Sequence, residues 1–265
     1  MVKYFHIIRH KGENMKDERV LAYCNLFAVL GAIPKLLELD GDAKKLVENK
    51  KISIGFSVKG GPCGKLSFNC GKAEMTEGTK GCSIKLYFPS CKKFNDMIDG
   101  KAMPLPLSGF HRLGFLLGPF MKLTDILSSY LRPEPKALES RDFFERSTVL
   151  MLHVIAGAVA QIGNTDKIGM FSASNIVDGN IKLGIGEDTA VFVGCRGHEL
   201  KFLGEGSYDS FSEMKFEDIN VARDLFDGTI NAVVAVGEGK VRICGMISQI
   251  DNVNRILDRV SLYLA

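Results

Sequence analysis

Alternation of apolar and polar residues predicts short β-strands in both halves of the chain. Ile52, Ile54, Phe56 and Val58 alternate with polar or small residues, which is the period of a strand with one buried face. Further segments of the first half that we expect to be strands lie near 65–70, 72–76 and 81–88. In the second half we expect strands near 180–185, 189–195, 199–203, 211–216, 229–236 and 239–244.

Helical periodicity surrounds each set of strands. An apolar helical stretch opens each half, and Pro34 is placed to start a further helix because proline suits the first helical turn. A short helix ending in Asp-Gly follows the fourth strand of each half, since glycine takes the left-handed conformation that stops a helix. An amphipathic helix closes each half. The predicted helices are Glu18–Gly31, Ser90–Ile98 and Pro119–Leu131 in the first half, and Arg141–Gly163, Ile219–Phe226 and Gln249–Leu264 in the second.

The glycine-rich segment Lys59–Gly64 resembles a phosphate-binding loop at first sight. A Walker loop needs a glycine, four residues and then Gly-Lys-Ser/Thr, so that successive N–H groups converge on the phosphates. Here the position of the first glycine is Lys59, and Leu66 follows the Gly-Lys pair. The segment also joins two alternating runs, so we expect it to be a hairpin turn.

Two sequence boxes occur twice, in the same order. "DMIDG" at Asp96–Gly100 recurs as "DLFDG" at Asp224–Gly228, and Asp125–Leu131 is similar to Asp258–Leu264. The chain is therefore expected to contain two similar domains, 1–132 and 133–265, divided near the prolines at 133 and 135. Short strands with helices around them predict an α+β fold, with a mostly antiparallel five-stranded sheet covered by helices in each domain.

Composition is that of an ordinary soluble protein, with 46% hydrophobic and 25% charged residues in 265. No signal-peptide pattern opens the sequence, and seven scattered cysteines suggest reduced thiols, so we expect a cytoplasmic location. Residues 1–132 hold 21 Lys/Arg and 12 Asp/Glu, a net charge of +9, whereas residues 133–265 carry −6. Either the halves attract each other, or the basic half meets an anionic partner, or both are solvated faces.

Few residues suggest a metal site, a membrane span or catalysis. Cys63 with Cys70, and His6 with His10, lack metal-ligand spacing, and no metal or cofactor is expected. The apolar run 149–162 is shorter than a membrane span and includes His153, so a buried helix is the simpler interpretation. No nucleophile elbow, zinc-protease motif or dinucleotide fingerprint is present. We expect a protein that is not an enzyme, with a thiol-dependent activity as the weaker alternative.

The order of these segments resembles the sterol carrier protein type two family. The resemblance rests on "FSVKGGPCGKLSFNCGKAEMTEG" and "MIDGKAMPLPL" in the first half, and on "AVFVGCRGHELKF" and "MKFEDINVARDLFDG" in the second. It covers roughly 50–131 and 176–264. The first half departs from the pattern at "GFHRLGFLLGPFMKL", where a final strand is hard to place.

The resemblance implies a domain that binds or transfers lipid in an apolar tunnel between sheet and helices, without chemistry. The implied ligand is a fatty acyl chain, an acyl-CoA or a sterol-like molecule. An anionic membrane surface contacted by the basic first half is a further expected partner, nucleic acid is not, and a homo-oligomer stays open. The alternative is a structural or interaction module with a filled core and no ligand.

Candidate ligand-binding residues follow from the position of the closing helix, which would line the tunnel. They are also ordinary core residues by composition. The candidates are Phe110, Phe115, Leu116, Leu117, Phe120 and Met121 in the first half, and Met246, Ile247 and Ile250 in the second. Met103 and Met121 would suit an adaptable pocket.

Overall fold

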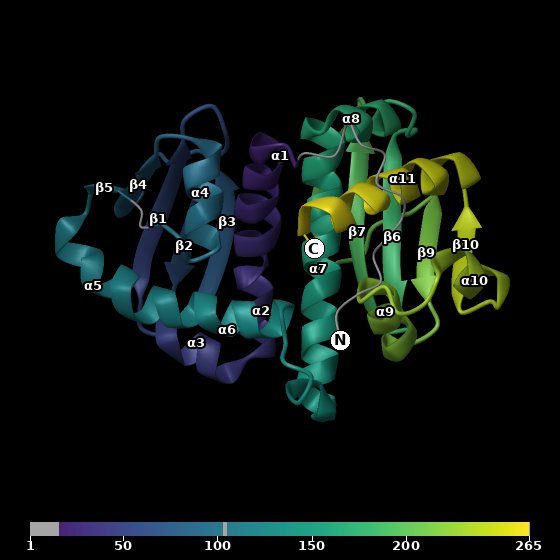
Figure 1. Cartoon of the computed structure of the whole chain (residues 1–265), viewed down its shortest axis with the longest axis horizontal. Coiled ribbons are helices and arrows are strands. Elements are labelled where there is room, and N and C mark those ends of the chain that lie inside the picture. The colour runs from purple at the N-terminus through teal and green to yellow at the C-terminus, as the bar shows by residue number, and fades with distance from the viewer. Residues whose placement is uncertain (1–15, 103–104, 265) are drawn as a thin grey trace.

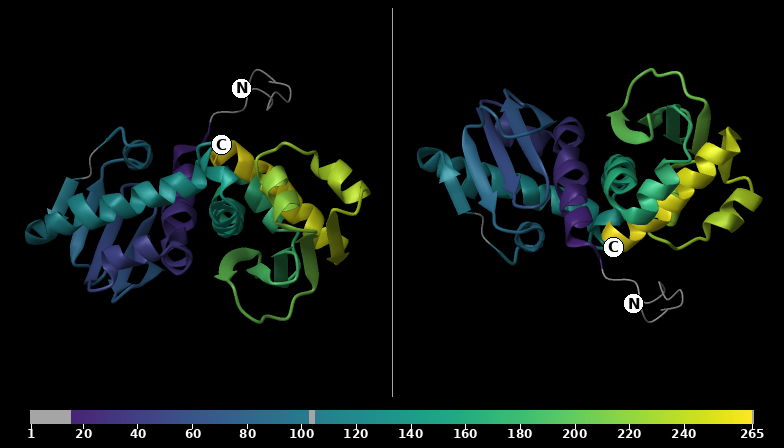
Figure 2. Two further views of the ribbon diagram at one scale, coloured as in Figure 1. Left: turned by 90° about the horizontal axis from the view of Figure 1, so that it is seen from below. Right: turned by 90° about the horizontal axis from the view of Figure 1, so that it is seen from above.

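The computed structural model describes residues 16–102 and 105–264, and it contains two five-stranded sheets on either side of a central helical layer (Figure 1). The two perpendicular views show that each sheet has helices along one face (Figure 2). The elements of the first half are α1 (Glu18–Tyr23), η1 (Cys24–Val29), η2 (Leu30–Ala32), α2 (Ile33–Leu39), α3 (Gly41–Val47), β1 (Lys51–Val58), β2 (Cys63–Asn69), β3 (Lys72–Glu77), β4 (Ile84–Phe88), α4 (Cys91–Ile98), β5 (Leu105–Ser108), η3 (Phe110–Arg112), α5 (Leu113–Phe115), η4 (Leu116–Phe120) and α6 (Met121–Leu131).

The second half repeats this order with one additional helix, α10. Its elements are η5 (Ala137–Glu139), α7 (Arg141–Thr165), α8 (Lys167–Ala173), β6 (Gly179–Ile185), β7 (Thr189–Arg196), β8 (Glu199–Gly204), β9 (Ser212–Phe216), α9 (Ile219–Phe226), α10 (Ala232–Gly237), β10 (Val241–Gly245) and α11 (Ile247–Leu264). The expected α+β fold with two similar domains is confirmed.

Both sheets have the same topology. The strand orders are β3-β2-β1-β4-β5 and β10-β9-β6-β7-β8, so β1 and β6 lie at the centre. In each sheet the central strand is antiparallel to the following strand and parallel to the fourth. The sheets are therefore mixed, with one parallel pair each, because the segment between the third and fourth strands crosses back to the end of the sheet where the first strand begins.

The hairpin predicted at 59–64 is present. Ile52 pairs with Phe68 and Ser57 with Cys63, while Gly60 has a φ of +72°, a conformation that favours glycine. Along β2, Leu66 and Phe68 are buried and the residues between them are only partly covered. The alternation in the sequence therefore corresponds to one face directed into the core.

The two opening helices pack against each other in antiparallel directions at the centre of the molecule. Lys35 lies near Val149 at one end of the pair, and Gly157 meets Ala28 nearer the other. A Cβ atom added at Gly157 would lie 3.2 Å from both the Cα and the Cβ of Ala28. By length and composition alone, the stretches Glu18–Leu39 and Arg141–Thr165 could cross a membrane, but here most of each is buried between the sheets.

One sequence prediction is wrong. Residues 229–236 contain α10 rather than a strand, because the Asn231 side chain accepts bonds from the N–H groups of Val233 and Val234 and caps a helix. The final strand of the first half, which the sequence left hard to place, is β5 within the Pro-rich segment, and the stretch after it is helical. Local capping thus outweighs the strand preference of a valine-rich run.

Candidate functional site

The six first-half candidates lie together where β5 leads into the closing helix, and we call them the first apolar corner. Phe115, Leu116 and Phe120 are buried against the sheet, whereas Phe110, Leu117 and Met121 are exposed. Neighbouring side chains of one helix therefore lead from the surface into the interior. Met103, like His6 and His10, lies outside the described residues.

An irregular helical segment shapes this corner. Pro119 lies inside η4, where it has no N–H to donate, and residues 116–120 take the wider π-helical geometry. Gly114 and Gly118 add no side-chain contacts. The helix that carries the exposed candidates is therefore less regularly bonded than α6, which continues it.

A row of phenylalanine rings fills the interior below the first apolar corner. Phe68 contacts Phe115 and Phe120, with centroid separations of 5.6 and 6.4 Å, and Phe56 lies 6.4 Å from Phe120. Phe94 extends the row from Phe56. These rings occupy space between the sheet and the closing helix, where a tunnel was expected, so the tunnel stays a prediction.

The second-half candidates lie where β10 leads into α11, and we call Phe211, Met246, Ile247 and Ile250 the second apolar corner. Ile250 is buried, whereas Met246 and Ile247 are exposed. Phe211, which sequence reasoning missed, is also exposed, and its carbonyl accepts a bond from the Met246 N–H. In the structure, Phe211 lies beside Gly245, whose φ is +90° and where an added Cβ would collide with the Phe211 carbonyl. The glycine itself is the trace of this contact in the sequence.

A buried polar anchor fixes the start of α11 beneath this corner. Gln249 is fully buried, its Oε1 accepts a 2.6 Å bond from the Ser212 hydroxyl, and its Nε2 donates to the Val177 carbonyl. Because both ends of the amide are satisfied, the corner is held against β9 and the segment before β6. The exposed apolar residues therefore stand on a rigid base.

Two hollows lie away from both corners. One, of about 240 Å³, is lined by residues of α10 and the segments around it, including Ile230, Val234 and Lys240. The other, of about 400 Å³, lies between the halves and includes Lys35, Val149 and Glu205. Neither contains any of the nine candidate residues.

A charged cluster borders the hollow between the halves. Glu205 Oε1 lies 2.6 Å from Lys35 Nζ and 3.0 Å from His153 Nε2. Burial lowers the pKa of His153, and its bond to Glu205 opposes this only in part. Burial would raise the pKa of Glu205, but bonds from Lys35 and His153 outweigh it and lower that pKa. His153 is therefore a buried residue whose ring nitrogen is hydrogen-bonded.

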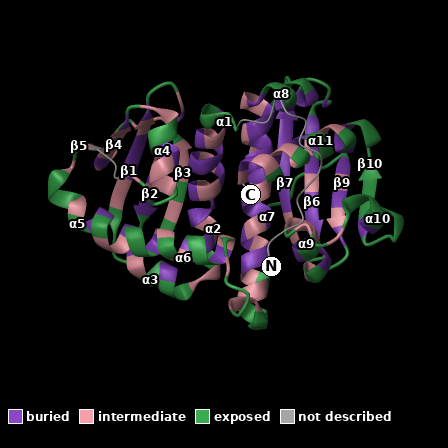
Figure 3. Ribbon diagram, viewed as in Figure 1, coloured by how far each residue is buried: buried purple, intermediate pink, exposed green. Residues whose placement is uncertain are grey.

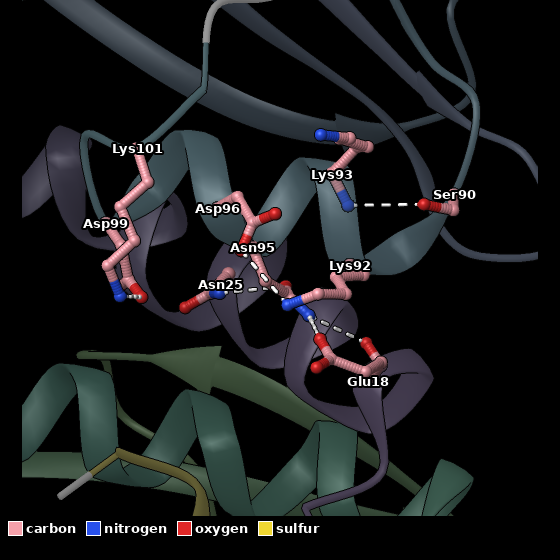
Figure 4. A network of polar contacts seen from close by, with 9 residues as sticks. All are labelled: Glu18, Asn25, Ser90, Lys92, Lys93, Asn95, Asp96, Asp99 and Lys101. Atoms are coloured by element: carbon pink, nitrogen blue, oxygen red, sulfur yellow. Dashed lines mark hydrogen bonds and ion pairs between the residues drawn. The ribbon is translucent and has the colours of Figure 1, made fainter.

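Two lysines of the first half, which we predicted to face a membrane, are paired with carboxylates on α4 and just after it. Lys92 pairs with Asp96 at 3.4 Å and Lys101 with Asp99 at 2.9 Å, while the Lys93 N–H bonds the Ser90 cap (Figure 4). Membrane contact through the basic half stays a prediction.

The same view shows what holds α4 to the opening helix. The Asn95 Nδ2 group donates to the main-chain and side-chain oxygens of Glu18, and Asn25 donates to Asn95 Oδ1 at 3.0 Å (Figure 4). A buried amide with every group bonded ties the two helices rigidly.

Burial raises the pKa of three cysteine thiols, Cys24, Cys91 and Cys195. Burial first, and then Asp166, raises the pKa of Cys24 to about 12, and burial also raises the pKa of Cys91 and Cys195. A nucleophilic cysteine needs the opposite shift. Within residues 16–102 and 105–264, no group of three or more His, Cys, Asp or Glu residues is placed to hold a metal ion.

Comparison with known proteins leaves the family unassigned. No family model matches the chain, and no curated protein matches it. Among the solved structures that match is one titled "UbiJ-SCP2 Ubiquinone synthesis protein", with 16% identity and a TM-score of 0.31, covering 40% of this chain and 94% of that one. At that TM-score the likeness carries no weight for function.

Proposed function

We propose that the protein binds an amphipathic lipid, with an acyl chain or sterol-like body, at its apolar corners and without catalysing a reaction. The observation that carries the proposal is the arrangement shared by the two corners. At the start of each closing helix, exposed apolar side chains stand beside buried ones of the same helix, as Ile247 does beside Ile250. Large apolar side chains that are exposed close together in the chain are candidates for a binding surface.

The energetics favour such a ligand. About 25 cal/mol is gained for each Å² of apolar surface removed from water, so covering several large side chains offsets the cost of ordering a ligand. The π-helical segment at Leu116–Phe120 adds a place where the closing helix can adjust. An acyl chain that displaces the Leu117 side chain would meet Phe120 next.

The phenylalanine row supports a second candidate, an interaction module with no ligand. The rings of Phe56, Phe68 and Phe120 contact one another below the first apolar corner. A domain that acts through its surface needs this filled interior, whereas a carrier must open it. The two candidates differ in whether lipid enters the fold.

Native mass spectrometry of the purified chain, followed by solvent extraction, tests the proposal. We expect a stoichiometric co-purified lipid, or uptake of added oleate or cholesterol. Ile247→Glu and Leu117→Glu should each weaken oleate binding by about tenfold, because a carboxylate cannot share an apolar surface without losing its water.

Val233→Glu is the matched control. Val233 on α10 is 80% exposed and Ile247 is 78% exposed, so the two side chains are matched in exposure. Val233 precedes β10 in the chain and Ile247 follows it, so Val233 lies outside the second apolar corner. This control should bind oleate as the unchanged protein does. A clean unliganded mass with no uptake of either lipid would overturn the proposal in favour of the interaction module.

A further inference from the structure

The four sheet edges differ in how they are protected. β3 lies beside α2 and β8 lies against α7, so the central helices cover both inner edges. β5 carries Pro106, which has no N–H to offer another strand. β10 carries no proline, and its helical neighbours are the short α10 just before it and α11 just after it. Four of its five residues are exposed (Figure 3). An exposed edge strand without proline is a template for a further strand.

The hydrogen-bond pattern shows which groups β10 leaves free. The carbonyl of Lys240 accepts a bond from Glu217, and the N–H of Met246 donates to Phe211, so both groups point toward β9 or the residue before it. Because antiparallel pairs alternate, Arg242 and Cys244 also point inward. The N–H and C=O groups of Val241, Ile243 and Gly245 are therefore directed away from the sheet.

This arrangement is complementary to itself. If a second strand VRICG runs antiparallel with Ile243 opposite Ile243, then Val241 lies opposite Gly245. All these residues direct their backbone groups outward, so each opposed pair can exchange two hydrogen bonds. No shift of register is needed to match donors with acceptors.

The side chains fit the same pairing. Ile243 lies on the sheet face that carries Met214 and Phe216, yet it is 39% exposed, and in the pair it would meet its own copy. On the other face Arg242 would stand opposite Cys244, beyond which lies Glu213. Glu213 already pairs with Lys182 at 2.8 Å, so what the register gives Arg242, which neighbours Lys215 within its own chain, is an uncharged residue opposite it rather than a second cation.

We propose that two copies of this chain associate through β10, antiparallel about Ile243, to form one continuous ten-stranded sheet. The partner is a second copy because the edge matches itself in backbone register, places Ile243 against Ile243 and sets no like charges directly opposite each other. Exposed Ile247 and Met246 follow the strand directly and would flank the junction. The proposal does not depend on lipid binding.

Analytical ultracentrifugation of the full chain is the first test. We expect a dimer at micromolar concentration, and we expect Ile243→Pro to raise the dissociation constant by at least about tenfold. The proline removes an outward N–H and no bond to β9, so the fold should be kept, which circular dichroism checks. A monomeric unchanged protein, or a dimer unaffected by Ile243→Pro, overturns the proposal.

Disulfide trapping tests the proposed register, in which Ile243 of one copy lies opposite Ile243 of the other. In a background with the exposed Cys63, Cys70 and Cys244 replaced by serine, Ile243→Cys should form a covalent dimer on oxidation, because opposed hydrogen-bonded residues have Cα atoms about 5.5 Å apart. Arg242→Cys is the control, since residue 242 would oppose residue 244. Equal trapping at both positions contradicts the proposed register.

Discussion

Two tyrosines at equivalent positions tie the closing helices to the rest of their halves. The Tyr130 hydroxyl donates to Asp40 at 2.8 Å, and the Tyr263 hydroxyl donates to Asp166 at the same distance. Both aspartates are also N-caps, of α3 and α8. In each half, the repeated box that ends in Tyr-Leu therefore supplies a tyrosine that bonds an N-cap carboxylate. This bond ties the closing helix to the short helix that precedes the sheet.

These tyrosines predict sensitivity to alkaline pH. Burial first, and then the neighbouring aspartate, raises the pKa of Tyr130 and of Tyr263 from the ordinary tyrosine value of 10.0 to about 12. A raised folded-state pKa adds stability that is complete below pH 10 and is lost as the pH rises toward about 12. The double variant Tyr130→Phe, Tyr263→Phe should lose roughly 1 kcal/mol per bond at pH 8 and show a flatter decline above pH 10.

Denaturant unfolding at pH 8 and pH 11 measures this effect. Tyr208→Phe is the control, because that exposed hydroxyl makes only a 3.4 Å bond to Leu203. A double variant with the same alkaline slope as the unchanged protein would contradict the assignment.

At the scale of elements, the antiparallel pair of opening helices depends on small residues at its closest approach. Gly157 meets Ala28 where the two backbones come together, and Ala156, Ala158 and Ala160 are buried around it. Large side chains there would push the helices apart, and with them the sheets on either side (Figure 2).

Replacing Gly157 should therefore be costly. Gly157→Leu is expected to destabilise the fold by about 1–3 kcal/mol, because overpacking forces backbone shifts in a filled interior. Gly114→Leu is the matched control, since Gly114 is helical and exposed with no heavy atom near its added Cβ. Urea unfolding of both variants measures the free energy of unfolding. If Gly157→Leu were as stable as Gly114→Leu, the helix pair would tolerate a large side chain at its closest approach.

For the whole molecule, a single apolar core runs through both halves. The buried cluster includes side chains of both opening helices and both sheets. Lys35 and Glu205 form an ion pair across the halves, and Tyr130 stacks on Phe143 nearby at a centroid distance of 4.6 Å. The interface is thus chiefly apolar, and the opposite net charges of the halves remain largely at the surface.

Association of the halves should therefore resist salt. Separate chains 1–132 and 133–265, produced together, are expected to co-purify and to stay together in about 1 M salt, where charges are screened beyond about 3 Å. Pull-down of one chain by a tag on the other measures this. Separation by salt would show that charge holds the halves, and Gly157→Leu in the second chain should weaken the complex at any salt concentration.

The local sequence pattern predicted most helices and strands, but it did not predict which of the candidate ligand-binding residues are buried and which are exposed. The alternation at Ile52–Val58 identified β1, and the repeated boxes identified two similar halves, because strand period and helix stops are local properties. The nine candidates lie at two corners of the fold, and their role in binding stays a prediction. Which of them are exposed, such as Leu117, and which are buried, such as Phe115, depends on the sheet and helix packed against them.

The sequence by itself determined the α+β class, the similarity of the two halves and the position of each closing helix, since these follow from periodicity and from glycine and proline chemistry. Only the tertiary structure decided that the two opening helices form one shared core, that phenylalanine rings fill the first half, and that β10 is an open edge. These features depend on contacts between segments far apart in the chain, such as Ala28 with Gly157, and residue order alone does not bring such segments together.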